Sequence, residues 1–186
     1  MTRRATAVAA LAAFAAAAAA PAPAHPPEEC DCANIDDRVL PRAEVGTWEM
    51  EPLDARYAPY VDGALAQVRA KGQGRLAVMC ERGDERAYAL YRAPAEHRDA
   101  LREVGDKIKV QYAFDDGTTI PRDFEWDAEG RYWRGPFGDE SRLANLMKSE
   151  MTVTVSPLAL DDVESEFPLK GSWRSISAAF ERCGLS

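Results

Sequence analysis

Short runs of alternating apolar and polar residues recur along the chain from Trp48 onward. The clearest run covers residues 107–114, where apolar residues alternate with Lys107, Lys109 and Gln111. The apolar members of this run are Ile108, Val110, Tyr112 and Phe114. A period of two predicts a half-buried strand with a charged outer face. The same alternation predicts strands at 48–53, 76–80, 88–91 and 151–155.

Clusters of glycine and aspartate separate these predicted strands. They occur at 71–74, 82–84, 115–117 and 127–130. Such residues favour turns because their backbones accept the conformations that a turn requires. The last cluster joins 124–126 to 132–133, which predicts a hairpin. In the first predicted strand, Trp48, Met50 and Leu53 are expected to share one face.

Two segments have the spacing of short helices instead. Asp139 can cap the first, and Ser172 can cap the second, which Gly184 can end. Their apolar faces are Leu143, Leu146 and Met147 in the first, and Trp173, Ile176, Phe180 and Cys183 in the second. Many short strands with two helices predict a mainly β or α+β fold, namely one β-sandwich-like antiparallel domain.

The first 24 residues have a composition of their own. Arg3 and Arg4 form a cationic start, residues 5–20 are small and apolar, and small residues follow up to Ala24. This order predicts a secretory signal peptide over residues 1–24. The apolar run is too short and too rich in alanine to span a hydrocarbon core of ~30 Å, so we expect no stable membrane span after cleavage.

Export leads us to expect a periplasmic or secreted protein. Residues 25–45 are rich in proline and acidic residues and lack apolar periodicity, which predicts a flexible N-terminal arm. Residues 46–186 then form a single β-rich globular domain.

The charge balance limits the classes of partner. The chain contains 31 acidic and 23 basic side chains, and its formal net charge is −8. Nucleic acids and anionic lipids both require basic surfaces, so neither is an expected partner.

All four cysteines follow the predicted signal peptide, which in an exported protein indicates two disulfides. Cys80 ends an inward-facing run of a strand, and Cys183 lies on the inward stripe of the last helix. We therefore favour a Cys80–Cys183 bridge, which would attach the last helix to the sheet.

That pairing leaves Cys30 and Cys32 in the arm. They can form a structural bridge, either with each other or crossed to Cys80 and Cys183, or they can exchange thiols. They can also bind a metal together with His25, which cleavage after Ala24 would make the N-terminal residue. An N-terminal amine and its imidazole suit copper, so a small copper- or thiol-active protein is the alternative function. The leading interpretation requires no cofactor.

The densest aromatic and arginine segment covers residues 126–137. The candidates for a binding surface in it are Trp126, Arg131, Tyr132, Trp133 and Arg134. Aromatic residues and arginine are enriched where proteins recognise partners. The alternative is a hairpin whose aromatic residues pack inward.

A catalytic signature is not found. The chain has two histidines, His25 and His97, and neither accompanies a nucleophile motif such as Gly-x-Ser-x-Gly. We therefore expect a protein that is not an enzyme.

The order of several segments resembles a known group of proteins. These segments are 76–80 (LAVMC), 88–91 (YALY), 110–115 (VQYAFD), 151–157 (MTVTVSP), 166–171 (EFPLKG) and 180–184 (FERCG). Over residues 74–184 the chain resembles small exported bacterial proteins related to type VI secretion accessory proteins and, more loosely, invasion-associated locus B proteins. The resemblance implies an exported, non-catalytic accessory protein of the cell envelope, associated with secretion, whose partner is an envelope protein or polymer.

Overall fold

The computed structural model describes residues 43–53, 62–72, 74–128, 131–137 and 142–185. All of them belong to one unit, Cys32–Ser186. The predictions that concern residues 1–42 and the proposed cap Asp139 therefore lie outside the described residues. The former include the signal peptide, His25, Cys30 and Cys32.

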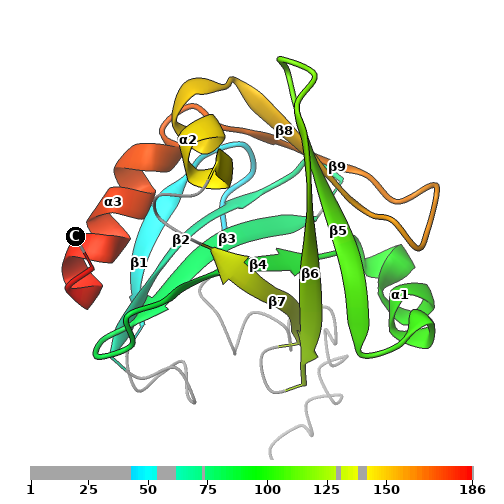
Figure 1. The fold of residues 1–186 in the computed structure, drawn as a ribbon, viewed down its shortest axis with the longest axis horizontal. Helices are drawn as coiled ribbons and strands as arrows, with labels where there is room; N and C mark the ends of the chain where they lie inside the picture. Colours follow the sequence, from blue (N-terminus) through cyan, green and yellow to red (C-terminus); the bar gives the residue numbers. More distant parts are fainter. Residues whose placement is uncertain (1–42, 54–61, 73, 129–130, 138–141, 186) are drawn as a thin grey trace, which may run out of the picture. The chain divides into compact units, whose positions relative to one another are not determined.

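Within the described residues, nine strands form one antiparallel sheet, which confirms the predicted antiparallel β fold (Figure 1). The strands are β1 (Glu49–Leu53), β2 (Gly63–Arg69), β3 (Arg75–Glu81), β4 (Ala87–Arg92), β5 (Lys107–Phe114), β6 (Thr119–Asp127), β7 (Tyr132–Phe137), β8 (Thr152–Pro157) and β9 (Ser165–Pro168). Their order across the sheet is β1-β2-β3-β4-β7-β6-β5-β8-β9. Strands β5 and β6 cross the direction of β2–β4 steeply, so the sheet curves around one side (Figure 1).

Three α-helices accompany the sheet in the described part of the chain: α1 (Arg98–Val104), α2 (Arg142–Ser149) and α3 (Ser172–Cys183). Helices α2 and α3 are the two predicted ones. Helix α1, with the short 3₁₀ turn η3 (Ala95–His97) before it, was not predicted. Its single buried residue is Leu101, so it has no apolar stripe that a sequence pattern could reveal.

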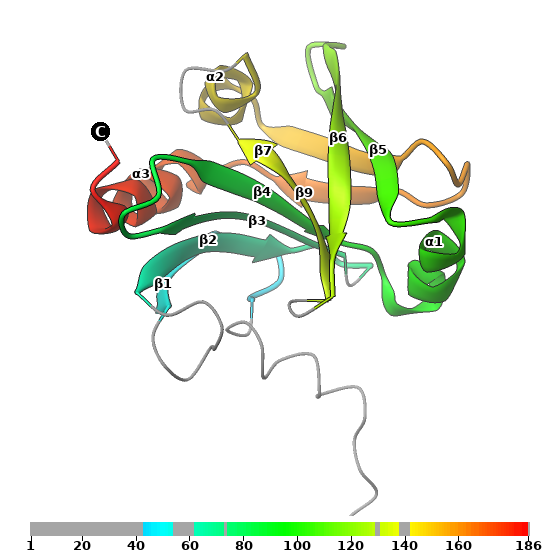
Figure 2. The same ribbon diagram turned by 60° about the horizontal axis from the view of Figure 1, so that its bottom comes forward.

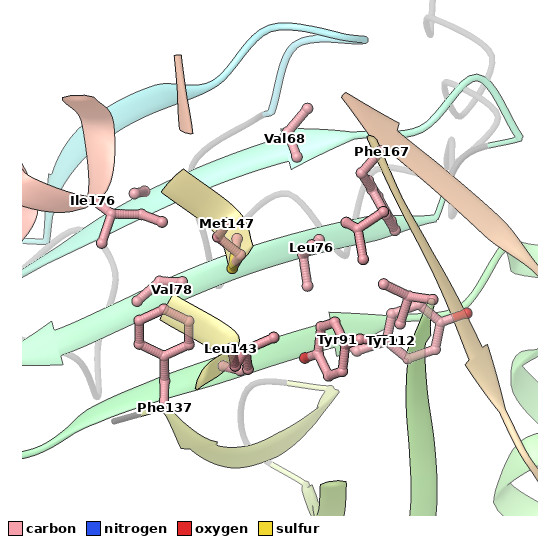
Figure 3. Packing of buried hydrophobic residues seen from close by; sticks show 14 of the residues in the cluster. Val68, Leu76, Val78, Tyr91, Tyr112, Phe137, Leu143, Met147, Phe167 and Ile176 are labelled. Carbon is pink, nitrogen blue, oxygen red and sulfur yellow. The ribbon is translucent and has the colours of Figure 1, made fainter. Parts of the chain in front are cut away.

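The main core lies inside the curve of the sheet. It contains inward residues of both halves of the sheet together with residues of all three helices. Figure 3 shows how Leu76 and Val78 of β3 approach Leu143 and Met147 of α2 and Ile176 of α3. Because two halves of one sheet enclose this core, the fold is sandwich-like, as predicted.

Strands β2–β4 are also buried on their outer face. A second apolar cluster, called the outer cluster, lies there and consists of Leu53, Leu65, Ala77, Met79, Leu90 and Tyr132. Leu53 belongs to it, whereas Met50 packs against the main core with Trp48. The expectation that Leu53 shares a face with these two is wrong, because successive strand residues point to opposite faces.

Helix α3 closes the main core. Its C-terminal end is the predicted one, since Gly184 has a left-handed φ of 79°. Its N-cap differs: Gly171 occupies that position, and the Ser172 hydroxyl instead donates a hydrogen bond of 2.8 Å to the Met147 carbonyl of α2. The predicted bridge between Cys80 of β3 and Cys183 is present and links α3 to the sheet.

The two edges of the sheet approach each other at Trp48. Its indole nitrogen donates a hydrogen bond of 2.6 Å to the Pro168 carbonyl of β9. The Ser175 hydroxyl of α3 donates to the Trp48 carbonyl at 3.2 Å. Trp48, which directly precedes β1, therefore links the first strand of the sheet to the last one.

Candidate ligand-binding groove

The predicted hairpin of aromatic and arginine residues is formed by β6 and β7, and its side chains divide between two faces. Trp133 and Tyr132 are each only 2% exposed. Trp133 belongs to the main core and Tyr132 to the outer cluster. Trp133 therefore packs inward, as the alternative interpretation of this hairpin expected, whereas Tyr132 is buried on the outer face. Trp126, Arg131 and Arg134 keep access to solvent.

Trp126 lies near the turn that joins β6 to β7 and is held there by two contacts. Its ring meets the Trp133 ring edge to face, with 5.3 Å between centroids. The Arg102 guanidinium of α1 lies 4.3 Å from the Trp126 ring centroid and also forms an ion pair of 2.9 Å with Asp106. A cation over an indole face is a favourable electrostatic contact. Arg102 was not a sequence candidate, because only the fold brings α1 to this hairpin.

Arg134 makes a similar contact on the outer face. Its guanidinium lies 3.5 Å from the ring centroid of Tyr88 on β4, and it forms an ion pair of 3.8 Å with Glu81. The Tyr88 hydroxyl donates a hydrogen bond of 3.0 Å to Asp84, which fixes the ring. The Arg134 side chain is 27% exposed, so part of this stack faces solvent.

Strand β6 places three carboxylates on the same outer face. Asp123, Glu125 and Asp127 alternate along the strand, and Glu125 is the register partner of Arg134. On the far side of this row, Lys107 pairs with Glu125 at 2.6 Å and Lys109 with Asp123 at 3.9 Å. The hydrogen bond to Glu125 raises the pKa of Lys107. Both ion pairs are exposed, and exposed pairs bind weakly enough for a ligand to compete with them.

A groove opens between the carboxylate row of β6 and the Arg134–Tyr88 pair because β6 and β7 separate. Their ladder extends only over Glu125–Asp127 and Tyr132–Arg134, after which the strands diverge (Figure 1). The groove has a volume of about 730 Å³. Its lining residues are Tyr88, Asp123, Glu125, Trp126, Asp127, Ala128, Arg134, Gly135 and Pro136. We call this cavity the fork groove.

The fork groove offers charge and aromatic surface to a ligand. Its described lining contains carboxylates, one guanidinium and two aromatic residues, but no histidine, cysteine or hydroxyl of serine or threonine. Among the described residues, strong pKa shifts occur elsewhere: burial raises the pKa of Tyr91 to about 12 and also raises that of Tyr112. Both tyrosines belong to the main core, where they stay neutral.

The remaining sequence candidates are the cysteines and His25. The Cys80–Cys183 bridge excludes the connectivities in which these two residues pair with Cys30 and Cys32. Cys30, Cys32 and His25 themselves lie outside the described residues.

The same described ranges bear on metal binding and on membrane crossing. No group of three or more histidine, cysteine, aspartate or glutamate side chains is arranged there to hold a metal ion. No helix in those ranges has the length and apolar character that a membrane crossing requires.

Comparisons with known proteins do not extend this picture. No protein-family model matches the chain, and neither a curated protein nor a solved structure matches it at a significant level.

Proposed function

We propose that this protein is an exported, non-catalytic binding or accessory protein of the bacterial cell envelope, and that the fork groove is its contact surface. The observation that carries this proposal is the partly exposed Arg134–Tyr88 stack facing a row of three carboxylates across a groove of about 730 Å³. Concave sites that combine apolar surface with a few fixed polar groups are the usual places for ligands.

Two features support the exported location. The segment 1–24 has the order of a secretory signal, and the Cys80–Cys183 bridge suits an oxidising compartment. A role beside a secretion apparatus rests on the sequence resemblance alone.

The lining of the fork groove and the net charge of −8 favour a partner that carries basic or hydrogen-bonding groups. An envelope protein or an envelope polymer such as peptidoglycan meets this requirement. Arg134, already stacked on Tyr88, would hold an acidic or hydroxyl group of the same ligand.

The compartment is tested first. Cells that express the full chain are fractionated by osmotic shock, and the released protein is weighed by mass spectrometry. We expect the protein in the periplasmic or extracellular fraction with a mass that corresponds to loss of residues 1–24. An uncleaved protein in the cytoplasm would contradict the proposal.

The contact surface is tested by photo-crosslinking in cells. A benzoylphenylalanine replaces Ala128, which is exposed and lines the fork groove, and in a control protein it replaces Gln111 on the outer face of β5. We expect a crosslinked partner from position 128 only, reduced several-fold by Arg134→Ala or Tyr88→Ala. Sedimentation with purified peptidoglycan distinguishes the polymer from a protein partner. Equal products from both positions, or products insensitive to Arg134→Ala, would show that the groove is not the contact surface.

The second candidate function is copper or thiol chemistry at His25, Cys30 and Cys32. The Cys80–Cys183 bridge favours it in one respect, because it leaves Cys30 and Cys32 to pair with each other, to remain thiols or to bind a metal. Thiol counting and copper titration of the exported protein test it. Two free thiols, or copper bound at one equivalent and lost in Cys30→Ala/Cys32→Ala, would support it, whereas four oxidised cysteines without copper binding would end it.

A further inference from the structure

Strand β1 forms one edge of the sheet, because its only neighbour in the strand order is β2. Figure 2 shows β1 at the margin of the sheet, with α3 beside it. In an antiparallel pair, alternate residues bond to the neighbouring strand, and the residues between them point their N–H and C=O groups the other way. An edge strand therefore presents backbone groups to which another chain can bond.

Met50 is the residue of β1 whose backbone groups face away from β2. The Trp48 carbonyl faces α3, since it accepts the hydrogen bond from Ser175, and the direction of backbone groups repeats every two residues. Glu49 and Glu51 then face β2, as the register and the hydrogen bonds at the end of β2 also require. In the described part of the chain, no hydrogen bond outside the strand ladder reaches the Met50 backbone.

This open edge is short, because a residue closes it at each end. Ser175 occupies the Trp48 carbonyl at one end. Pro52 follows Met50 by two residues and has no N–H to donate at the other end. The open edge is therefore a window centred on Met50, which suits a short extended segment.

A groove lies between this window and α3, with a volume of about 630 Å³. We call it the edge groove. Its lining residues are Gly46, Thr47, Trp48, Met50, Pro168, Lys170, Gly171, Arg174, Ser175 and Ala178. This described lining contains two cations and no carboxylate, whereas the fork groove has three carboxylates and one guanidinium.

The cations of the edge groove are available to a ligand. Lys170 and Arg174 are both exposed, and within the described residues neither forms an ion pair. Ala178 and the exposed Arg182 continue the row at intervals of four residues along α3, a spacing that keeps them on one side of the helix. In a chain of net charge −8, a local surplus of cations favours an anionic ligand.

We propose that the edge groove binds an extended acidic segment of a partner protein, which adds to β1 as a further strand. The backbone of the segment bonds to the N–H and C=O of Met50, and its acidic side chains pair with Lys170 and Arg174. Every second side chain of a strand faces the same side, so the segment carries its acidic residues at alternate positions. This proposal is independent of the fork groove, whose carboxylates favour a basic partner.

A second copy of this chain fits the edge groove less well. Antiparallel pairing of two β1 strands about Met50 would place Glu49 of one copy opposite Glu51 of the other. Like charges directly opposite each other destabilise a pair of strands. The side chains of β1 therefore favour a different protein as the occupant.

The test follows the Met50 amide by hydrogen exchange and NMR in the exported protein. The probe is a short synthetic peptide of alternating valine and aspartate, and the control peptide has lysine in place of aspartate. Without peptide, the Met50 amide should exchange faster than those of Glu49 and Glu51, which bond to β2. We expect the aspartate peptide to slow this exchange several-fold and the lysine peptide to leave it unchanged.

Three outcomes of this experiment would overturn the proposal. Protection by both peptides would show that charge does not select the ligand, and protection by neither would show that no strand is added. A Met50 amide that is already protected without peptide would mean that a second copy or another part of this chain occupies the edge.

Methylated peptides test the backbone pairing. One version of the aspartate peptide is N-methylated at its valines and another at its aspartates. Because only alternate amides of an added strand face β1, one version should bind several-fold more weakly than the other. Equal affinities would overturn strand addition.

Protein variants test the contribution of the two cations. Lys170→Ala/Arg174→Ala is expected to weaken binding of the aspartate peptide several-fold. The matched control Lys71→Ala/Arg86→Ala removes two exposed cations that do not line the edge groove and should leave the affinity unchanged. Equal weakening by both variants, or no weakening by the first, would overturn the assignment of Lys170 and Arg174.

Discussion

Asp115, at the turn between β5 and β6, accepts hydrogen bonds from the start of β8. The donors are the backbone amides of Met151 and Thr152, at 3.1 and 2.7 Å, and the Thr152 hydroxyl. These bonds, chiefly those from Thr152, hold the pKa of Asp115 below the ordinary value of an aspartate. A turn that the sequence predicts from Asp115, Asp116 and Gly117 therefore also positions a distant strand.

The Asp115 bonds predict a specific dependence of stability on pH. Because the folded state lowers this pKa, the carboxylate stabilises the fold above the unfolded pKa, and this contribution is lost as the pH falls through the folded pKa. We expect Asp115→Asn to be less stable than the wild type at pH 7, with a difference that shrinks as the pH falls below about 4. Urea unfolding at several pH values measures this, with Asp123→Asn as an exposed control. A difference that is independent of pH would contradict the assignment.

Gly135 has a steric reason to be glycine, where β7 passes β6. A Cβ atom there would lie 2.7 Å from the Phe124 ring and 2.9 Å from the Asp123 carbonyl oxygen. We expect Gly135→Ala to lower the free energy of unfolding by about 1–3 kcal/mol, as overpacking does. Gly72→Ala is the matched control, since no atom lies within 4 Å of a Cβ at that position. Equal urea midpoints for the two variants would contradict this reason.

At the scale of elements, sequence patterns succeed where one face is exposed. The run at β5 shows clear alternation because Lys107 and Lys109 face solvent. Strand β2 escaped prediction because six of its seven residues are buried, so its sequence lacks a clear alternation of apolar and polar positions. Strand order also lies beyond local patterns. Strand β7 pairs on one side with its sequence neighbour β6, but on the other side it pairs with the distant β4 rather than with β8.

The attachment of α3 to the sheet predicts the largest single loss of stability. The Cys80–Cys183 bridge joins residues 103 positions apart. In the chain-entropy model, closing such a loop contributes about 4–5 kcal/mol. We expect Cys80→Ala/Cys183→Ala to lose a stability approaching this value, measured by urea unfolding. Cys30→Ala/Cys32→Ala is the control and should lower the free energy of unfolding far less. A comparable decrease would show that the arm cysteines contribute as much to stability as the Cys80–Cys183 bridge.

At the scale of the whole described unit, the candidate site depends on contacts between elements that are distant in the sequence, and no local sequence pattern predicts such contacts. Trp126 and Arg134 were recognisable as an aromatic and arginine cluster. Tyr88 and Arg102 complete it, but they come from β4 and α1, which reach the hairpin only through the sheet order and the curvature of the sheet. The burial of Tyr132 was equally hidden, because nothing in the hairpin reveals a second apolar cluster on the outer face.

The same curvature brings the first and last strands together, so that Trp48, beside β1, is linked to β9 by a hydrogen bond. Replacing Trp48 with phenylalanine removes the hydrogen bond to the Pro168 carbonyl and keeps an aromatic ring. We expect Trp48→Phe to cost about 1–3 kcal/mol, the usual range for a lost hydrogen bond that leaves its acceptor unsatisfied. Hydrogen exchange should accelerate in β1 and β9 together, because the bond joins these two edge strands. We call this junction the seam.

Trp173→Phe is the matched control for this prediction. Its indole is partly exposed on α3 and packs against Lys148 and Phe180 rather than against β9. This variant should leave exchange in β9 unchanged. Faster exchange in β1 alone after Trp48→Phe would mean that the two edges open independently and that the sheet is held in its curve by the core and the disulfide. Joint acceleration would identify the seam as a single cooperative unit.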